Sequence, residues 1–579
     1  MTPNPNTTAC DAIVAALAAS GVQHACITPG SRSTPLTVAF AQNRAIKSWL
    51  HLDERSSAFF ALGLARATGK PVALVCTSGT AASNYHPAVV EANHSRIPLI
   101  VCTADRPQRL RDVGADQTMD QVRMFGPNVR WAMDLALPAF SGPARHYFEG
   151  VAIRAFNASL APLPGPVHLN IPFEEPLLGA PDEPREERLM PAPMFADVPA
   201  PPPASAELGP ALQALQNARK PLLIAGPESG GLAAGPIVDL AQRIGAPILA
   251  DPLSGLRIGE HDLSHVLDSY DAMLRDRRWS TLEPDAIIRF GGVPTSKALN
   301  QALAGLQGTT HVLCDRWMSW RDPEQVATHV VHGDPSLIAT EMANRLSPLP
   351  DGSWLEEWKA RNRRARNAMQ SASMSFEDLF EGRLFAEIQA SAAPGTTLLV
   401  GNSMPVRDAD SFLISAPQRL SVVGNRGVNG IDGVNSTALG AAAGGRAPVI
   451  LVIGDISFYH DLNGLWAARR HRLDLTIVLV NNNGGGIFHY LPQASHDDIF
   501  EEWFGTPPDL DFAPVVEMYG GTFEKAEDWA QFAANMAAPS GGLRVIELRT
   551  DRSRNTAMHR EAWAAAAEAA WGVPVAVAP

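Results

Sequence analysis

The chain has few cysteines, and those present do not form the patterns that cysteine chemistry requires. Its 579 residues contain 5 cysteines, an odd number without a CxxC pair, and most of them lie in apolar runs. Cysteine in such a run behaves as a small hydrophobic residue, which argues against a disulfide-rich protein and against a zinc site. We expect a protein of the reducing cytoplasm.

Long apolar runs and positive charge are also scarce. No stretch approaches the roughly 18 uninterrupted apolar residues of a membrane-spanning helix, and the N-terminal segment lacks the basic start of a signal peptide. The 47 Lys and Arg are outnumbered by 60 Asp and Glu, so the formal net charge is −13. A negative chain repels nucleic acids and anionic membranes, so we expect neither as a partner. An anionic substrate would have to be captured by local arginines.

The chain is too long for one hydrophobic core. Short apolar runs alternate with segments of helical periodicity, which is typical of parallel sheets covered by helices on both faces. We predict an α/β protein of three doubly wound domains at 1–188, 208–346 and 375–579, joined by a Pro/Ala-rich linker at 189–207 and by a linker and helix at 347–374. Ligands bind such sheets beyond the carboxyl ends of the strands.

Two motifs at predicted strand ends point to a metal and a phosphate. Asp455 and Asn482 are 27 positions apart (482 − 455), about the length of a strand–helix–strand crossover, so both should lie at one sheet edge. Their oxygens and the carbonyl of Gly484 form a sparse set that suits Mg²⁺. Gly454 and the following helix start would let a diphosphate approach closely. Each motif alone is also common as an Asp N-cap or an Asn-Gly turn.

Gly454-Asp455 followed at this distance by Asn481-Asn482 resembles the signature of the thiamine diphosphate-dependent decarboxylase and acetolactate synthase superfamily. The resemblance implies thiamine diphosphate with Mg²⁺, or Mn²⁺, and an order of pyrimidine-binding, central and diphosphate-binding domains that matches the three blocks. It also implies a homo-oligomer, a dimer or a dimer of dimers, with active sites at the subunit interface. The metal ligands that the resemblance implies are Asp455, Asn482 and Gly484. The cofactor contacts that it implies are Glu54, Asn402, Ser403, Ile431, Gly454, Asp455, Ile456, Ser457 and Asn482.

Glu54, in the run HLDER, is the candidate catalytic residue. Read alone, it is more simply a solvated residue that opens a helix. In the superfamily a glutamate after the second strand of the pyrimidine domain contacts the aminopyrimidine N1′ of the cofactor, where a carboxyl group activates it by proton transfer.

Within the superfamily, several stretches closely resemble the family of 2-succinyl-5-enolpyruvyl-6-hydroxy-3-cyclohexene-1-carboxylate (SEPHCHC) synthases. They include TPGSRSTPL, TADRPQRLRDVGADQTMDQ, NRGVNGIDG and NNNGGGIF, and the resemblance runs from about residue 10 to about residue 550. It implies a menaquinone-pathway enzyme that decarboxylates 2-oxoglutarate and adds the succinyl group to isochorismate. Both substrates are dicarboxylates.

Arginines at strand ends independently suit anionic substrates, because the guanidinium fork binds carboxylates and keeps its charge when desolvated. A single surface arginine is usually just solvated, but four occur in strand-end motifs. By resemblance, one group of residues would bind isochorismate, and a second group would face the distal carboxylate of 2-oxoglutarate. Arg426 would lie between the two groups. Lys297 would be the substrate-binding residue that the central domain contributes. The first group is Ser31, Arg32, Arg106 and Gln117; the second is Ser403 and Arg407; Ile487 and Phe488 would wall the pocket. Some relatives have an arginine after the lysine, where this chain has Ala298.

Two alternatives remain open from the sequence. One is another thiamine diphosphate-dependent 2-oxoacid decarboxylase or an acetolactate synthase-like carboligase, which needs no clamp for a dicarboxylate. The other is a non-catalytic chain that keeps the fold as a regulator or scaffold. The presence together of Glu54, Asp455 and Asn482 argues against the latter.

Overall fold

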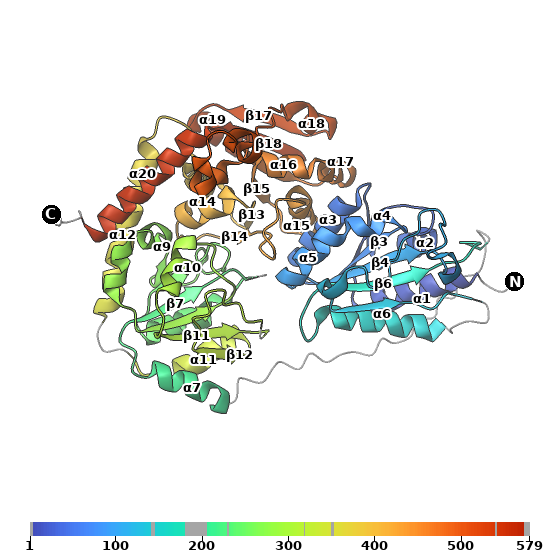
Figure 1. Ribbon diagram of the computed structural model, residues 1–579, viewed down its shortest axis with the longest axis horizontal. Coiled ribbons are helices and arrows are strands. Elements are labelled where there is room, and N and C mark those ends of the chain that lie inside the picture. Colours follow the sequence, from blue (N-terminus) through green and yellow to red (C-terminus); the bar gives the residue numbers. More distant parts are fainter. Residues whose placement is uncertain are drawn as a thin grey trace.

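The computed structural model describes residues 4–139, 145–179, 205–228, 231–317, 319–348, 352–538 and 541–572, with backbone only at 205–207. Each third of the chain forms one six-stranded, wholly parallel sheet with helices packed around it (Figure 1). This confirms the predicted α/β class. No helix among the described residues is long and apolar enough to cross a membrane.

The N-terminal and C-terminal sheets have the same topology. Their strand orders are β2-β1-β3-β4-β6-β5 and β14-β13-β15-β16-β18-β17. In each sheet the second strand of the domain lies on one side of the first strand and the third lies on the other side, so the direction in which strands are added reverses between the first and third strands. Ligands of open parallel sheets bind at such a reversal. The N-terminal elements are α1(Pro5–Ser20), β1(His24–Ile27), α2(Thr34–Gln42), β2(Lys47–Leu50), α3(Glu54–Thr68), β3(Val72–Cys76), α4(Thr80–Asn84), α5(His86–Ser95), β4(Leu99–Asp105), β5(Trp131–Asp134), α6(Arg145–Leu160) and β6(Val167–Pro172).

The C-terminal sheet is built around two strands that are buried along nearly their whole length, β15 (VILVIG) and β16 (LTIVLVN). Such continuous apolar strands are typical of a parallel sheet covered on both faces. The C-terminal elements are α12(Ser353–Ser375), α13(Arg383–Ser391), β13(Thr396–Val400), α14(Met404–Phe412), β14(Leu420–Val423), α15(Val434–Ala443), β15(Val449–Gly454), α16(Asp455–His460), α17(Trp466–His471), β16(Leu475–Asn481), the short 3₁₀ helix η5(Gly486–Tyr490), α18(Ala513–Met518), β17(Thr522–Ala526), α19(Trp529–Ala537), β18(Leu543–Arg549) and α20(Arg552–Trp571).

The central sheet has a different order, β12-β11-β10-β7-β8-β9. The chain begins inside the sheet at β7, adds β8 and β9 on one side, and then adds β10, β11 and β12 on the other side. The predicted linker 189–207 lies outside the described residues except for 205–207, which already belong to α7; α12 fills most of the predicted stretch 347–374. The central elements are α7(Ser205–Leu215), β7(Pro221–Ala225), α8(Ala234–Arg243), β8(Ile248–Ala250), β9(Val266–Leu267), α9(Tyr270–Leu274), β10(Ala286–Phe290), α10(Lys297–Ala304), β11(Thr310–Asp315), β12(His329–His332) and α11(Pro335–Arg345).

The N-terminal and C-terminal domains meet where α3 packs against α15 (Figure 1). The two helices approach closely because each has a glycine at the contact. A Cβ at Gly63 would lie 2.0 Å from Thr437 O, and one at Gly440 would lie 2.0 Å from Phe60 O. Any larger residue at either position would push the domains apart.

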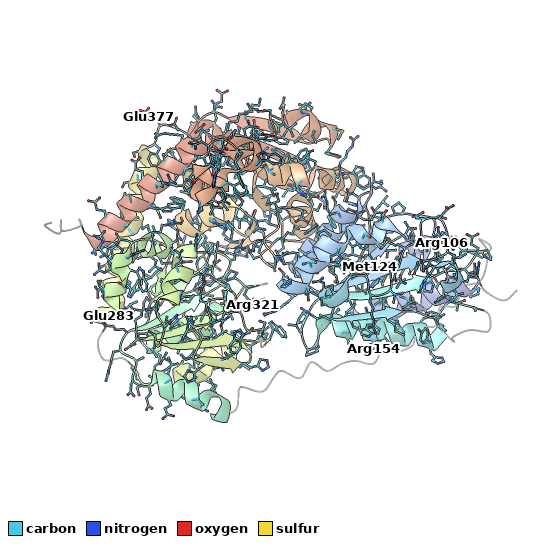
Figure 2. The ribbon with its side chains drawn as sticks, viewed as in Figure 1. Arg106, Met124, Arg154, Glu283, Arg321 and Glu377 are labelled. Carbon is cyan, nitrogen blue, oxygen red and sulfur yellow. The ribbon has the colours of Figure 1, made fainter. Side chains whose placement is uncertain are left out.

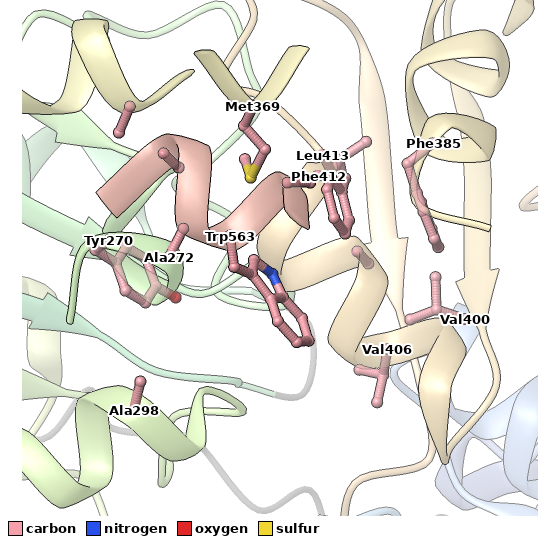
Figure 3. Close-up of a cluster of buried hydrophobic side chains, with 14 of the residues drawn as sticks. Tyr270, Ala272, Ala298, Met369, Phe385, Val400, Val406, Phe412, Leu413 and Trp563 are labelled. Atoms are coloured by element: carbon pink, nitrogen blue, oxygen red, sulfur yellow. The ribbon is translucent and has the colours of Figure 1, made fainter. Parts of the chain in front are cut away.

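The central and C-terminal domains share one hydrophobic core. Figure 3 shows Trp563 of α20 among side chains of the central domain, Tyr270 and Ala272, and of the C-terminal domain, including Phe412. The buried Arg257 reinforces the junction by donating to Asp410 Oδ1 at 2.9 Å and to the carbonyl oxygens of Ala409 and Leu413 at 3.2 Å each. These bonds tie the end of α14, a helix that carries one of the predicted substrate residues, to the central domain.

Candidate active site

The carboxyl ends of β15 and β16 bring the predicted metal ligands together. The strands pair in parallel with Gly454 opposite Val480, so Asp455 and Asn482 follow them at the same edge. The backbone N–H of Gly484 donates to Asp455 Oδ2 at 2.8 Å. The juxtaposition expected from the spacing is therefore present.

This edge presents oxygen atoms suited to a hard cation. Asp455 is buried, and burial raises the pKa of its carboxyl to about 6. Asn482 Oδ1 is also buried and has no hydrogen-bond partner among the described residues. A Cβ at Gly484 would lie 2.1 Å from Gly505 O, so this turn requires glycine. A cation bound here would give the orphaned amide oxygen a partner, which shows that the donor set fits Mg²⁺.

The adjoining strand ends hold the other predicted cofactor contacts. Open space lies beside Gly454, where a Cβ would meet nothing within 4 Å. Ser457 Oγ donates to the carbonyl of Ile431 at 2.7 Å, which links α16 to the loop before α15. Asn402 donates to Asn425 O at 2.8 Å and to Gly430 O at 2.7 Å, anchoring the same loop. Ile456 follows Asp455 and donates its N–H to Asp455 Oδ1 at 2.8 Å.

Ser403, the residue before α14, has a strained backbone. Its φ of 70° and ψ of −124° lie in a region that only glycine adopts without cost. Such strain in a non-glycine residue persists when the surrounding structure enforces it, and it concentrates at functional sites.

A pair of substitutions separates this strain from the loss of the hydroxyl. Ser403→Gly and Ser403→Ala both remove the hydroxyl, but only glycine relieves the backbone. We expect the glycine variant to have a free energy of unfolding about 1 kcal/mol or more above that of the alanine variant. Denaturant titration of both variants measures the difference. Equal stabilities would show that the backbone at this position is not strained.

The sequence-predicted isochorismate group lies together at the carboxyl edge of the N-terminal sheet. Arg106 donates to Ser78 Oγ at 2.9 Å, and Gln117 Nε2 donates to Ser78 O at 3.1 Å. Burial lowers the pKa of Arg106, and the positive charge of nearby Arg32 acts in the same direction. Arg32 itself is buried and donates to Phe173 O at 3.0 Å.

Ser31 is the exposed member of that group and directly precedes Arg32. The edge therefore combines one exposed hydroxyl with two neighbouring cations, of which Arg32 is already paired with Glu175 Oε1 at 3.2 Å. Such an arrangement is relieved when an anion binds between the cations.

Glu54 opens α3 at the end of β2, on the same edge. Asp53 caps the helix by accepting from Ser56 N at 3.0 Å, which leaves the Glu54 carboxyl free of the capping role. Glu54 is half-buried, and burial raises the pKa of its carboxyl. It lines a cavity of about 610 Å³ together with Asn463, Trp466 and Tyr519.

Within one chain the Glu54 cavity and the metal edge have different linings. The residues lining the Glu54 cavity, as far as the structure describes them, do not include Asp455 or Asn482. The start of α3 instead contacts the far end of α16, where Arg55 donates to His460 O at 2.7 Å. The Glu54 cavity of one chain, as far as the structure describes it, therefore does not include the predicted metal ligands.

A second cavity of about 880 Å³ lies between all three domains and is lined by three predicted substrate residues, Lys297, Arg407 and Arg426. Burial lowers the pKa of Arg426; the carboxylate of Asp251 opposes this shift, and the positive charge of Arg407 adds to it. Arg321 of the central domain also lines this cavity and lies on the side facing the N-terminal domain (Figure 2). The concentration of cations suits a ligand with several carboxylates.

The remaining predicted residues have different surroundings. Ala298, the second residue of α10, packs in the hydrophobic core (Figure 3) and is not among the described residues that line the cavity. Ile431 is partly exposed rather than part of the core. Ile487 and Phe488 lie in η5 directly after the metal edge, and Phe488 packs on Phe504 with ring centroids 5.6 Å apart.

Two buried glutamates were not found from the sequence. Glu381, before α13, accepts from Asn482 Nδ2 at 3.1 Å and from Thr550 Oγ1 at 2.7 Å. Glu91, on α5, accepts from the backbone of the loop after β14. No local pattern marks either residue, because Asn482 is 101 positions from Glu381 and Gly427 is 336 positions from Glu91.

Comparisons with known proteins agree with this architecture. Residues 7–124 match the family described as "Thiamine pyrophosphate enzyme, N-terminal TPP binding domain", and residues 412–548 match "Thiamine pyrophosphate enzyme, C-terminal TPP binding domain". A crystal structure of benzoylformate decarboxylase from Polynucleobacter necessarius is similar in fold, with a TM-score of 0.70 over 95% of this chain and 99% of that chain at 18% identity.

Closer relatives span nearly the whole chain. The 2-succinyl-5-enolpyruvyl-6-hydroxy-3-cyclohexene-1-carboxylate synthase of Geobacillus kaustophilus is 47% identical over 95% of this chain and 96% of its own length. That of Chloroflexus aurantiacus is 46% identical over 95% of each chain. The chain therefore belongs to the SEPHCHC synthase family of thiamine diphosphate enzymes.

Proposed function

We propose that this protein is a SEPHCHC synthase, which decarboxylates 2-oxoglutarate and joins the resulting succinyl group to isochorismate with release of CO₂. The observation that carries the proposal is the cation-lined cavity between the three domains, whose wall includes Lys297, Arg407 and Arg426. Two dicarboxylate substrates require several such cations in a chain of net charge −13.

Each set of residues has a part in this reaction. Arg407, with Ser403 at the start of its helix, binds the distal carboxylate of 2-oxoglutarate. Arg32 and Arg106 bind the carboxylates of isochorismate, with Ser31 and Gln117 beside them. Ile487 and Phe488 exclude water from the pocket where the two substrates meet. Lys297 and Arg426 hold the remaining carboxylate charge between them.

Bound thiamine diphosphate would supply the carbon nucleophile and electron sink that decarboxylation of a 2-oxoacid requires. Asp455, Asn482 and the carbonyl of Gly484 would hold the Mg²⁺ that accompanies the diphosphate. Glu54, whose carboxyl pKa is raised by burial, would hold the proton that is exchanged with the ring nitrogen of the bound cofactor. This is the step on which activation depends.

Glu54 lines a cavity whose described residues do not include Asp455, and this supports a homo-oligomer. In a dimer, the N-terminal domain of one copy would meet the C-terminal domain of the other and complete both active sites. Leu52, beside Glu54, and Tyr459, on the metal-binding helix α16, are large apolar residues that are more than half exposed in one chain. Their exposure fits surfaces that a second copy covers.

Glu381 should orient the metal ligand Asn482. Its carboxylate accepts from the Asn482 amide nitrogen, so the amide oxygen faces the metal position. Replacing it with leucine is expected to weaken Mn²⁺ binding, measured by electron paramagnetic resonance with thiamine diphosphate present, by about 10- to 100-fold. Thr550→Val removes another hydrogen bond to the same carboxylate and should change the affinity little. Equal effects of the two changes would contradict the orienting role.

Substrate preference tests the proposed function against an acetolactate synthase-like reaction. With thiamine diphosphate and Mg²⁺, CO₂ release is measured from 2-oxoglutarate and from pyruvate, each with and without isochorismate. A synthase should prefer 2-oxoglutarate, and Arg407→Gln should reduce that preference. Equal or greater turnover of pyruvate would favour the alternative.

A further inference from the structure

The loop between β14 and α15, residues 424–430, carries Arg426 but is held by the N-terminal domain of the same chain. Glu91 of α5 accepts from the backbone N–H of Gly427 at Oε1 and of Val428 at Oε2, each at 2.8 Å. Its side chain is almost entirely buried. Two backbone donors on one buried carboxylate fix the position of the residues that directly follow Arg426.

The Glu91 carboxylate is itself held in place. Ser95 Oγ, one turn further along α5, donates to Glu91 Oε1 at 2.6 Å, and the Arg66 guanidinium lies 3.9 Å from the same oxygen. Arg66 also reaches the start of the loop, donating to Gly424 O at 2.7 Å and to Asn425 Oδ1 at 3.2 Å. Hydrogen bonds from the N-terminal domain therefore hold the loop on both sides of Arg426.

The loop is fitted closely to α5. A Cβ at Gly427 would lie 2.7 Å from Glu91 O, so only glycine allows this approach. On its other side, Arg426 Nη1 donates to Asn402 Oδ1 at 2.8 Å. The backbone of Arg426 is therefore placed by the N-terminal domain, and its guanidinium is aimed by the C-terminal domain.

We propose that Glu91 is a positioning residue that sets the location of Arg426 and thereby the affinity of the site for its carboxylate substrates. The inference rests on the proposed function, because it takes Arg426 as a substrate-binding residue. Binding groups displaced by as little as about 1 Å lose much of their effect. Each N-terminal domain would then serve two sites, shaping that of its own chain through Glu91 and offering Glu54 to its partner.

The first test measures the loop directly and needs no substrate. In Glu91→Gln one carboxylate oxygen becomes an NH₂ group, which cannot accept from the second backbone donor. Hydrogen exchange of the peptide covering 424–430 should become about tenfold faster. Glu149→Gln, which changes another buried glutamate of the same domain, should leave this peptide unchanged. Unchanged exchange in Glu91→Gln would overturn the proposal.

The second test asks whether Glu91 acts through Arg426. Glu91→Gln should raise the KM of a carboxylate substrate about tenfold while kcat and thiamine diphosphate affinity change less than about threefold. In a double-mutant cycle with Arg426→Gln, the second substitution should add little to the first. Additive effects, or a loss of kcat alone, would contradict positioning through Arg426.

The two tests also separate this inference from the proposed function. If the wild-type enzyme turned over another 2-oxoacid instead of 2-oxoglutarate, the proposed function would fail. The same cycle is then measured with that oxoacid, and coupling between Glu91 and Arg426 would still support the positioning role. Its absence there would overturn it.

Discussion

Glu54→Gln is expected to abolish turnover while leaving the fold intact. Glutamine keeps the shape of the side chain but cannot hold or exchange the proton that activates the cofactor, and loss of such a group typically costs about 10²- to 10⁴-fold in rate. The helix start should survive because Asp53, not Glu54, caps α3. Steady-state kinetics and circular dichroism of the purified variant measure both parts.

The neighbouring carboxylate provides a matched control. Asp53→Asn removes the same charge from the same cavity, and asparagine caps helices about as well as aspartate. We expect it to keep most of the activity. If Glu54→Gln kept near-normal activity, or if both variants lost it equally, the assignment of Glu54 as the activating residue would be wrong.

Asp455→Asn is expected to remove cofactor binding. The Asp455 carboxylate is the only charged group in the proposed metal set, so affinity for Mg²⁺ with thiamine diphosphate should fall by more than the roughly 10- to 100-fold that loss of an outer hydrogen bond costs. The thermal stabilisation that the cofactor and metal give the wild-type protein should then disappear. Thermal unfolding with and without both ligands measures this difference.

The stability of the cofactor-free variant should change little. Burial raises the pKa of Asp455 from 3.8 to about 6, so the folded state binds this proton more tightly than the unfolded state does. The free energy of unfolding therefore falls as the pH rises from 3.8 to about 6, and at neutral pH the buried charge is a cost that asparagine lacks. Relief of this cost should offset the one backbone hydrogen bond, from Ile456 N–H or Gly484 N–H, that the Asn amide nitrogen cannot accept, so at neutral pH the cofactor-free Asn variant should lie within about 1 kcal/mol of the cofactor-free wild type.

Asp461 is the control for this experiment, because burial also raises its pKa to about 6. It accepts from Ser56 and Ser436 at the junction of two domains rather than facing the metal edge. Asp461→Asn should lower the free energy of unfolding of the cofactor-free protein. It should keep the increase in thermal stability that the cofactor and metal produce. If that ligand-dependent shift were lost in Asp461→Asn and retained in Asp455→Asn, the metal site would be misplaced.

The features that follow from periodicity and chain spacing were predictable. The runs VILVIG and LTIVLVN read as buried parallel strands, and parallel neighbours place Asp455 and Asn482 at one edge. The predicted α/β class and family are confirmed. The similarity of the first and last domains became clear only from their shared strand order, which sequence spacing does not encode.

The features that depend on distant contacts were not predictable. Glu91 looks like an ordinary helix-face residue and Glu381 like an ordinary turn residue, and their importance arises from partners 336 and 101 positions away. The strain at Ser403 is a backbone conformation that no residue pattern reveals. The cavity that unites Lys297 with Arg407 depends on how three domains pack, which local propensity does not determine.

Consumption of isochorismate is the most direct test of the central claim. The purified protein is incubated with thiamine diphosphate, Mg²⁺ and 2-oxoglutarate, and isochorismate is followed by absorbance beside a matched control without the oxoacid. The account predicts a loss of isochorismate that requires every component. No loss, in protein shown to have bound the cofactor, would contradict the substrate assignment.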